Sequence, residues 1–383
     1  MKTKKSAKNI FITVAALAVL YALMVVLDMT IPATSNWAML LTVLRTGAVY
    51  ALVAVSMNLL NGFTGLFSLG QAGFMLLGAY TYAIFTIPVE ARNSVYQYFD
   101  GGLIQFTIPW PLALVLAGIV AAAFAFLIGL PVLRLKSDYL AIATVGFAEI
   151  IRAVCQWDGL GPVTNGSNVL KNYPRFNSFK IGDVSLATLM PVLIASLCIL
   201  VIVLLINSSY GRAFKAIRED EIAAEAMGIN LAKHKQLSFC ISSFFAGVGG
   251  ALLAMFAGTV QAAQFKSAMT YELLLIVVIG GIGSITGSVL ASFLFIGASE
   301  WWLRGLDMGE FLGIKAPGLF RNGFRLVVFS VIIMVFVLFF RKGIMGTKEL
   351  PDLPKAFKAS LKAAKAKKVQ KAKKAGKGGA LNG

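Results

Sequence analysis

Charged residues are scarce in this chain. Asp, Glu, Lys and Arg make up 14% of its 383 residues, whereas a soluble domain carries about a quarter. Hydrophobic residues instead make up 58%, and apolar runs of about 20 residues recur, the length that crosses about 30 Å of hydrocarbon. This composition excludes an ordinary soluble domain and predicts an all-α polytopic membrane protein.

Residues that build catalytic or metal centres are equally few. His234 is the only histidine, so the sequence offers no set of side chains for a hydrolytic centre. Cys155, Cys198 and Cys240 lie far apart, each in or beside an apolar run, without metal-ligand or disulfide spacing. The glycine-rich stretch 280–288 lacks the Gly-Lys-Ser/Thr that a Walker A loop needs to hold phosphates. We therefore expect no catalytic residue, no metal and no cofactor bound by this chain.

The apolar runs predict about 8–10 transmembrane helices. We interpret 10–27 as an uncleaved first span, because no convincing cleavage site follows it. The stretch 270–299 is too long for one straight span, and its glycines predict two short spans or a re-entrant pair. The candidate spans after the first are 38–60, 69–87, 110–130, 138–155, 186–206, 237–260, 270–282, 285–299 and 325–340.

Basic residues predict the orientation. Ten spans place both termini on one side of the membrane, and Lys and Arg gather near both ends of a chain whose net charge is +18. Positive residues favour the cytoplasmic side. We predict a cytoplasmic N-terminus (1–9), a membrane domain (10–340) with a cytoplasmic loop at about 207–235, and a cytoplasmic, disordered Lys/Ala-rich tail (341–383).

The most polar internal segment is "YGRAFKAIREDEIAAEAMGIN" (210–230). At 100° per residue, 212–228 forms an amphipathic helix. Asp220 and Glu221 are expected to break it near 219–221, and Gly228 to end it. An alanine-rich face buries little area but allows another surface to approach closely; the alternative is a solvated loop between spans. The apolar half holds Ala213, Phe214, Ala216, Ile217, Ala223, Ala224 and Met227, and the polar half holds Arg212, Lys215, Arg218, Glu219 and Glu225.

This segment resembles the cytoplasmic coupling loop of ABC-importer permeases, in which a pair of alanines precedes a glycine. Here the pattern is Ala223-Ala224 followed by Gly228. Ile222 stands where the common version has Glu, and the later Ile-x-Leu-Pro is missing, which points away from the maltose-type importers. Three further stretches resemble the branched-chain amino acid permease family of LivM type: "LNGFTGLFSLGQAGFMLLGAY" (60–80), "SDYLAIATVGFAEIIR" (137–152) with "TNGSNVL" (164–170), and "ELLLIVVIGGIGSITGSVLASFLF" (272–295).

The resemblance implies a multi-pass permease subunit in a bacterial cell membrane, importing branched-chain amino acids. It also implies a heterodimer with a homologous permease, two cytoplasmic ABC ATPase subunits that hold ATP and Mg²⁺, and an extracytoplasmic solute-binding protein. Urea or short amides are the alternative substrates, and an ATP-independent secondary transporter is the alternative class. The residues expected to contact the ATPase are Gly211, Arg212, Ala213, Ala216, Arg218, Glu219, Asp220, Ala223, Ala224 and Gly228.

Two groups of residues are candidates for the translocation path. The glycine-rich stretches 61–73 and 280–288 predict broken or re-entrant helices whose freed backbone groups line the path; the alternatives are an ordinary loop and close helix packing through Gly283-x-x-x-Gly287. Four membrane charges are expected to form a polar zone in the outer half that receives a zwitterion, or else one neutralised Glu149–Arg152 pair plus two snorkelling side chains. The candidates are Asn61, Gly62, Gly65, Ser68, Gln71, Gly280 and Gly283, with the charges Arg45, Glu149, Arg152 and Glu272.

The basic tail generates the first prediction. Its lysines are expected to adsorb to anionic lipid, at about 1 kcal/mol per residue near the surface, and without interleaved aromatics it is not expected to bind nucleic acid. Deleting 355–383 should therefore leave uptake nearly intact while changing membrane abundance, as measured by transport per copy of protein. Complete loss of transport at equal abundance would contradict this view of the tail.

Overall fold

The computed structural model describes residues 38–135, 137–181 and 184–302, with single positions and short runs between 21 and 30 and between 310 and 349. The predicted spans 10–27 and 325–340 lie mostly outside the described residues, and the N-terminus 1–9 and the tail from 351 onward lie wholly outside them. The long helices are α2 (Ala38–Asn58), α3 (Gln71–Thr86), α5 (Trp110–Val132), α6 (Ser137–Gln156), α8 (Leu189–Asn207) and α11 (Leu231–Ala257).

Shorter elements connect these helices. The short α-helices are α4 (Val89–Val95), α7 (Gly161–Thr164), α9 (Ser209–Glu219), α10 (Glu221–Ala226), α12 (Ser267–Gly280) and α13 (Ile285–Ile296). Two π-helical segments, η1 (Leu59–Thr64) and η5 (Gly297–Trp302), extend α2 and α13; the 3-10 turns are η2 (Asp158–Leu160), η3 (Phe176–Ser178) and η4 (Ala262–Gln264). The strands form two antiparallel pairs, β1 (Lys180–Ile181) with β2 (Val184–Ser185) and β3 (Glu310–Phe311) with β4 (Ile314–Lys315).

The predicted all-α polytopic membrane fold is confirmed. Within the described residues, five helices are long and apolar enough to cross a membrane, and α12 and α13 are shorter apolar helices. The predicted spans between 38 and 299 each match a helix to within a few residues. The largest difference is at α11, which begins at Leu231 rather than near 237. Asn230 caps it, its side chain accepting from Lys233 N at 2.9 Å.

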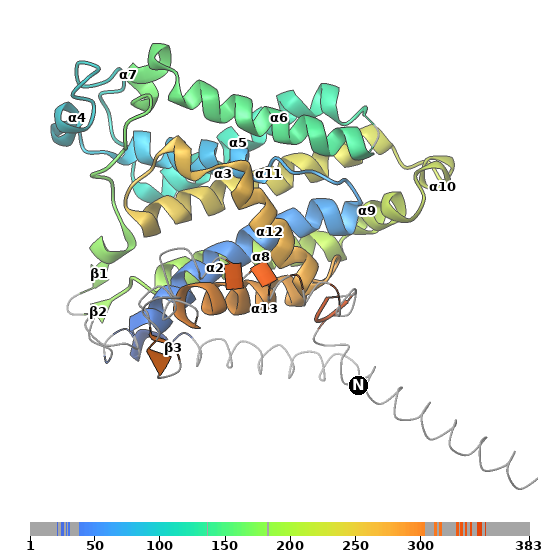
Figure 1. The fold of residues 1–383 in the computed structure, drawn as a ribbon. Coiled ribbons are helices and arrows are strands. Elements are labelled where there is room, and N and C mark those ends of the chain that lie inside the picture. Colours follow the sequence, from blue (N-terminus) through green and yellow to red (C-terminus); the bar gives the residue numbers. More distant parts are fainter. Residues whose placement is uncertain are drawn as a thin grey trace, which may run out of the picture.

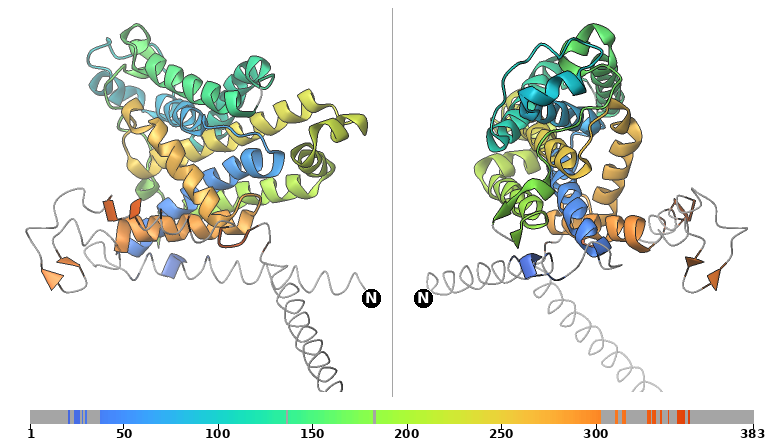
Figure 2. Two further views of the ribbon diagram at one scale, coloured as in Figure 1. Left: turned by 45° about the vertical axis from the view of Figure 1, so that its right-hand side comes forward. Right: turned by 90° about the vertical axis from the view of Figure 1, so that its left-hand side faces the viewer.

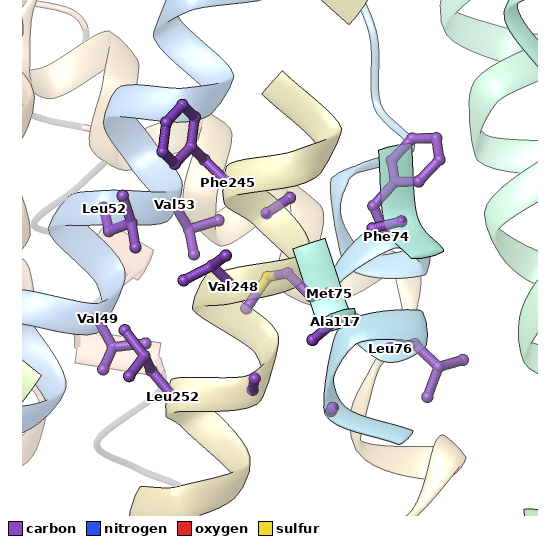
Figure 3. Packing of buried hydrophobic residues seen from close by; sticks show 14 of the residues in the cluster. Val49, Leu52, Val53, Phe74, Met75, Leu76, Ala117, Phe245, Val248 and Leu252 are labelled. Carbon is purple, nitrogen blue, oxygen red and sulfur yellow. The ribbon is translucent and has the colours of Figure 1, made fainter. Parts of the chain in front are cut away.

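Helix α11 forms the centre of the molecule. It packs against α5, α3 and α2, and Figure 3 shows Val49, Leu52 and Val53 of α2 facing Phe245 and Val248 of α11. Small residues bring the backbones together, because a Cβ at Gly78 or Gly250 would overlap the main chain of Gly247 or Met75. Close backbone approach through small residues is how membrane helices associate in the absence of a hydrophobic driving force.

The connections gather at two opposite ends of the bundle. Figures 1 and 2 show α9 and α10 projecting at one end, and α4, α7 and the β1–β2 pair at the other.

The region 270–299 consists of two helices, with α13 alongside α2 and α12 running obliquely. Gly280 packs directly on the backbone of Gly287 across the intervening turn. Gly283 lies in the turn before α13, so the close packing is made by Gly280 and Gly287 rather than through the predicted Gly283-x-x-x-Gly287 spacing.

The α3–α11 contact generates the second prediction. Replacing Gly78 with Leu should cost about 1–3 kcal/mol or more, because the added side chain meets the Gly247 backbone and cannot be relieved by a rotamer change. We expect a lower yield of monodisperse protein in detergent and a lower thermal midpoint. Gly146→Leu is the matched control, since a Cβ there meets nothing within 4 Å. Equal losses in the two variants would contradict the assignment.

Candidate functional site

The segment expected to act as the coupling loop folds as two helices. α9 ends at Glu219, and Asp220 begins α10 by accepting from Ile222 N at 2.9 Å and Ala223 N at 3.1 Å. Gly228 follows α10 with φ +83°, a conformation that favours glycine. The predicted break and the predicted stop are confirmed. We call α9 and α10 together the coupling segment.

The apolar face of α9 packs on the protein itself. Phe214 and Ile217 are completely buried, and α9 contacts α8, η1 and α11. Ala213 and Ala216 are half-buried as a result. Helical periodicity predicted this apolar face but not which surface covers it. Burying Phe214 and Ile217 within the chain removes their apolar area from water and so stabilises the fold.

The outward surface of the coupling segment is on α10. Ile222 and Met227 are 82% and 83% exposed, and Ala223 is exposed beside them, whereas Ala224 is only 4% exposed. A salt bridge of 2.7 Å from Lys235 Nζ to Glu221 Oε2 ties α10 to α11. Among the other expected contact residues, Gly211 is buried, and Arg212, Glu219, Asp220 and Gly228 are exposed.

Arg218 connects the coupling segment to the interior. Its Nη1 donates to the carbonyl oxygen of Gly62, and its side-chain stem lies against Gly65, where a Cβ would be 3.1 Å from Arg218 Cγ. A Cβ at Gly283 would lie 2.8 Å from Arg218 Nη1. One guanidinium therefore touches both glycine-rich stretches. Lys215, one turn earlier, sits 5.6 Å from the centre of the Phe63 ring.

The first glycine-rich stretch interrupts the helix after η1. Residues 65–70 are non-helical and are called the first break here. Asn61 Nδ2 donates to Ser68 O at 3.2 Å, Ser68 N donates to Asn61 Oδ1 at 3.1 Å, and Gln71 Nε2 donates to Ser56 Oγ at 2.8 Å. The prediction of a broken helix is confirmed. That Asn61, Gly62, Gly65, Ser68 and Gln71 line a path stays a prediction, since these polar groups brace the break itself.

The second break is the turn 281–284 between α12 and α13, and Asn58 holds it. The completely buried Asn58 amide donates to Ser284 O at 2.9 Å and to Ser288 Oγ at 2.8 Å, and its oxygen accepts from Gly283 N at 2.8 Å. Sequence analysis missed this residue. The available signal was a lone asparagine inside an apolar run just before a glycine-rich stretch.

Arg45 and the Glu149–Arg152 pair make separate contacts, and a common polar zone of the four membrane charges stays a prediction. Arg45 Nη2 pairs with Asp28 Oδ1 at 2.8 Å, and Arg45 Nε donates to Thr188 Oγ1 at 2.7 Å. Elsewhere, Glu149 pairs with Arg152 at 2.6 Å and accepts from Ser267 Oγ at 2.5 Å. The neutralised Glu149–Arg152 pair is therefore present, while Arg45 has a partner that the sequence did not indicate. Among the described residues, no ion pair joins these two groups.

Glu272 lies in a cavity of about 480 Å³ between α2, α11, α12 and η5. Glu300, Lys266 and Tyr50 line the same cavity. The cavity can accommodate a small polar or zwitterionic solute, since binding pockets measure about 300–1,000 Å³. Within the part of the chain that the structure describes, no cluster of three His, Cys, Asp or Glu side chains is placed to hold a metal ion.

Comparisons with known proteins identify a family. The family described as "Branched-chain amino acid transport system / permease component" matches residues 39–346. The proteins named "High-affinity branched-chain amino acid transport system permease protein LivM" of Salmonella typhimurium and Escherichia coli are 34% and 33% identical, over 66% of this chain and 61% of theirs. A "Probable branched-chain amino acid transport permease protein LivM" of Methanocaldococcus jannaschii is 25% identical over 64% of this chain and 76% of its own. The chain thus spans about three fifths of the length of the first two relatives. No solved structure matches it.

The Asn58 contacts generate the third prediction. Asn58→Leu keeps the branched shape of the side chain but leaves the buried groups of the second break without partners, which costs about 1–3 kcal/mol for each unsatisfied group. We expect a clearly reduced resistance to unfolding by sodium dodecyl sulfate in mixed micelles. Asn207→Leu is the control, because that exposed asparagine makes a local bond to Val203 O within its own helix. An unfolding curve of Asn58→Leu that matches the control would contradict the role of this amide.

Proposed function

The chain belongs to the family of branched-chain amino acid transport system permease components, and from this premise we propose that it is the membrane-spanning permease subunit of an ATP-driven importer of branched-chain amino acids. The assembly we propose contains a homologous permease, two ABC ATPase subunits that bind ATP and Mg²⁺, and an extracytoplasmic solute-binding protein. Its place is a bacterial cell membrane, with both termini cytoplasmic. The names of the LivM relatives support the substrate class.

The observation that carries the proposal is the exposed surface of α10. Ile222, Ala223 and Met227 leave an apolar, partly small-residue surface uncovered at the end of the bundle where the coupling segment projects. Such a surface fits the groove of a protein partner better than it fits water. We propose that the ATPase subunit docks here, on α10, while the buried face of α9 attaches the segment to the permease.

The contacts of α9 supply a route for the motion. Phe214 and Ile217 hold α9 to the helix bundle, and Arg218 holds it to Gly62 beside the first break. Asn58 joins that region to the second break. A displacement of α10 by the ATPase would therefore move both breaks together, because each link is a buried or charge-assisted contact rather than a flexible loop.

The solute route remains part of the proposal. Glu272 and Glu300 give the cavity between α2 and α12 carboxylates that can receive an ammonium group. Arg45 and Arg152 are engaged with Asp28 and Glu149, so the earlier expectation that they receive the solute carboxylate has no support from their contacts. Urea or a short amide stays the alternative substrate, and competition with leucine uptake separates the two.

The docking surface generates the fourth prediction. In proteoliposomes holding the complete importer, Ala223→Trp should lower ATP-dependent leucine uptake by about tenfold or more, because a bulky ring prevents close approach at a small-residue contact. Uptake and ATP hydrolysis stimulated by loaded binding protein should fall together while the protein remains inserted.

Ser94→Trp is the matched control, since Ser94 is exposed on α4 at the opposite end. Normal uptake and normally stimulated ATP hydrolysis in Ala223→Trp would contradict the proposal that the ATPase docks on α10. Uptake by the unaltered importer that does not need ATP would instead favour a secondary transporter.

A further inference from the structure

A short segment beyond the main bundle lies on the second break. Ile344 N donates to Ile279 O at 2.8 Å, and Met345 N donates to Gly280 O at 3.2 Å. These carbonyls belong to the last turn of α12, where a helix has no internal donors left for its final oxygens. Residues 343–346 therefore complete the end of α12 by backbone pairing.

Glu349, just after these residues, completes the start of α13. Its carboxylate accepts from Ile285 N at 2.7 Å, from Thr286 N at 3.1 Å and from Thr286 Oγ1 at 2.6 Å. The first N–H groups of a helix lack internal partners and carry partial positive charge, so a carboxylate is well suited to them. One short stretch thus closes both helix ends that flank the second break.

The fit between the two segments depends on glycine. A Cβ at Gly343 would lie 2.7 Å from Gly281 N and from Val278 O, and a Cβ at Gly281 would overlap Gly346 O. All three glycines have positive φ, at +70°, +117° and +60°. Side chains at these positions would separate the segment from the break, so the contact is made backbone to backbone.

The same break faces the coupling segment on another side. Arg218 and Glu219 of α9 and Thr286 and Glu349 line one cavity of about 720 Å³. Arg218 also approaches Gly283 within the break. The segment that carries Glu349 and the coupling segment therefore form walls of a shared cavity, with the second break between them.

We propose that residues 343–346, together with Glu349, form a strap that holds the second break in register with the coupling segment, and that Glu349 is a positioning residue for coupling. The inference rests on the proposed function and adds a segment that neither the family match nor the relatives' names assign a role. The strap fixes the ends of α12 and α13, so that a movement of α9 is passed to both helices rather than absorbed by the turn. Without it, ATP would be hydrolysed with less solute moved per cycle.

Glu349→Gln tests the strap in the complete importer. We expect faster amide hydrogen exchange in 281–288, and a drop of about tenfold in leucine uptake per ATP hydrolysed, the effect of losing a charge-assisted contact of about 1.4 kcal/mol. Stimulated ATP hydrolysis should persist. Glu90→Gln is the control, since Glu90 is an exposed carboxylate on α4 at the opposite end.

A second variant keeps the test decisive if Glu349→Gln does not accumulate. Thr286→Val removes one donor to Glu349 and keeps the backbone bonds, so a smaller change of the same kind is expected, and the double variant should be less than additive. Unchanged exchange and unchanged uptake per ATP in these variants, with a functioning unaltered importer, would overturn the strap alone. Failure of the unaltered importer to couple uptake to ATP would overturn the proposed function, while the exchange result would still report on the strap.

Discussion

A single buried amide, that of Asn58, satisfies the backbone of the second interruption of the membrane helices from a position just before the first. Backbone groups freed at membrane depth find no water, and each costs free energy unless the protein satisfies it. Asn58 supplies donors and an acceptor to the turn 281–284 from the end of α2, immediately before η1 and the first break. The end of α2, which leads through η1 into the first break, is therefore fastened to the second break.

The remaining contacts at this end attach further elements to the same point. Arg218 links α9 to Gly62, and Glu349 links the segment that follows the membrane domain to the start of α13. The opposite end is held by a different residue. The buried Arg92 guanidinium donates hydrogen bonds to the carbonyl oxygens of Ile84, Ile87, Ile104 and Phe106. Between the two ends, α3 and α11 approach backbone to backbone at Gly78–Gly247 and at Met75–Gly250. Such a contact transmits a displacement with little deformation.

The sequence predicted those features that depend on neighbours along the chain. Apolar length located the helices, and Asp220 and Gly228 located the break and the end of the coupling segment, because capping and positive φ are local effects. It did not predict features that depend on distant partners. Periodicity gave the apolar face of α9 but not that Phe214 would be covered by the permease itself, and Arg45 was expected in a solute zone before Asp28 was seen beside it. Asn58 was missed because an amide in an apolar run has no meaning until its partners, more than 200 residues away, are in place.

The central claim is that the coupling segment and the second break move as one body. Distances between spin labels measure this directly, in a chain whose three cysteines are replaced and with labels at Glu225, exposed on α10, and Ile282, exposed in the break. A second labelled pair joins Glu225 to Ser94 at the opposite end. The account predicts that the Glu225–Ile282 distance is the same in the nucleotide-free and vanadate-trapped importer while the Glu225–Ser94 distance changes. A Glu225–Ile282 distance that changes as much as the other would contradict it.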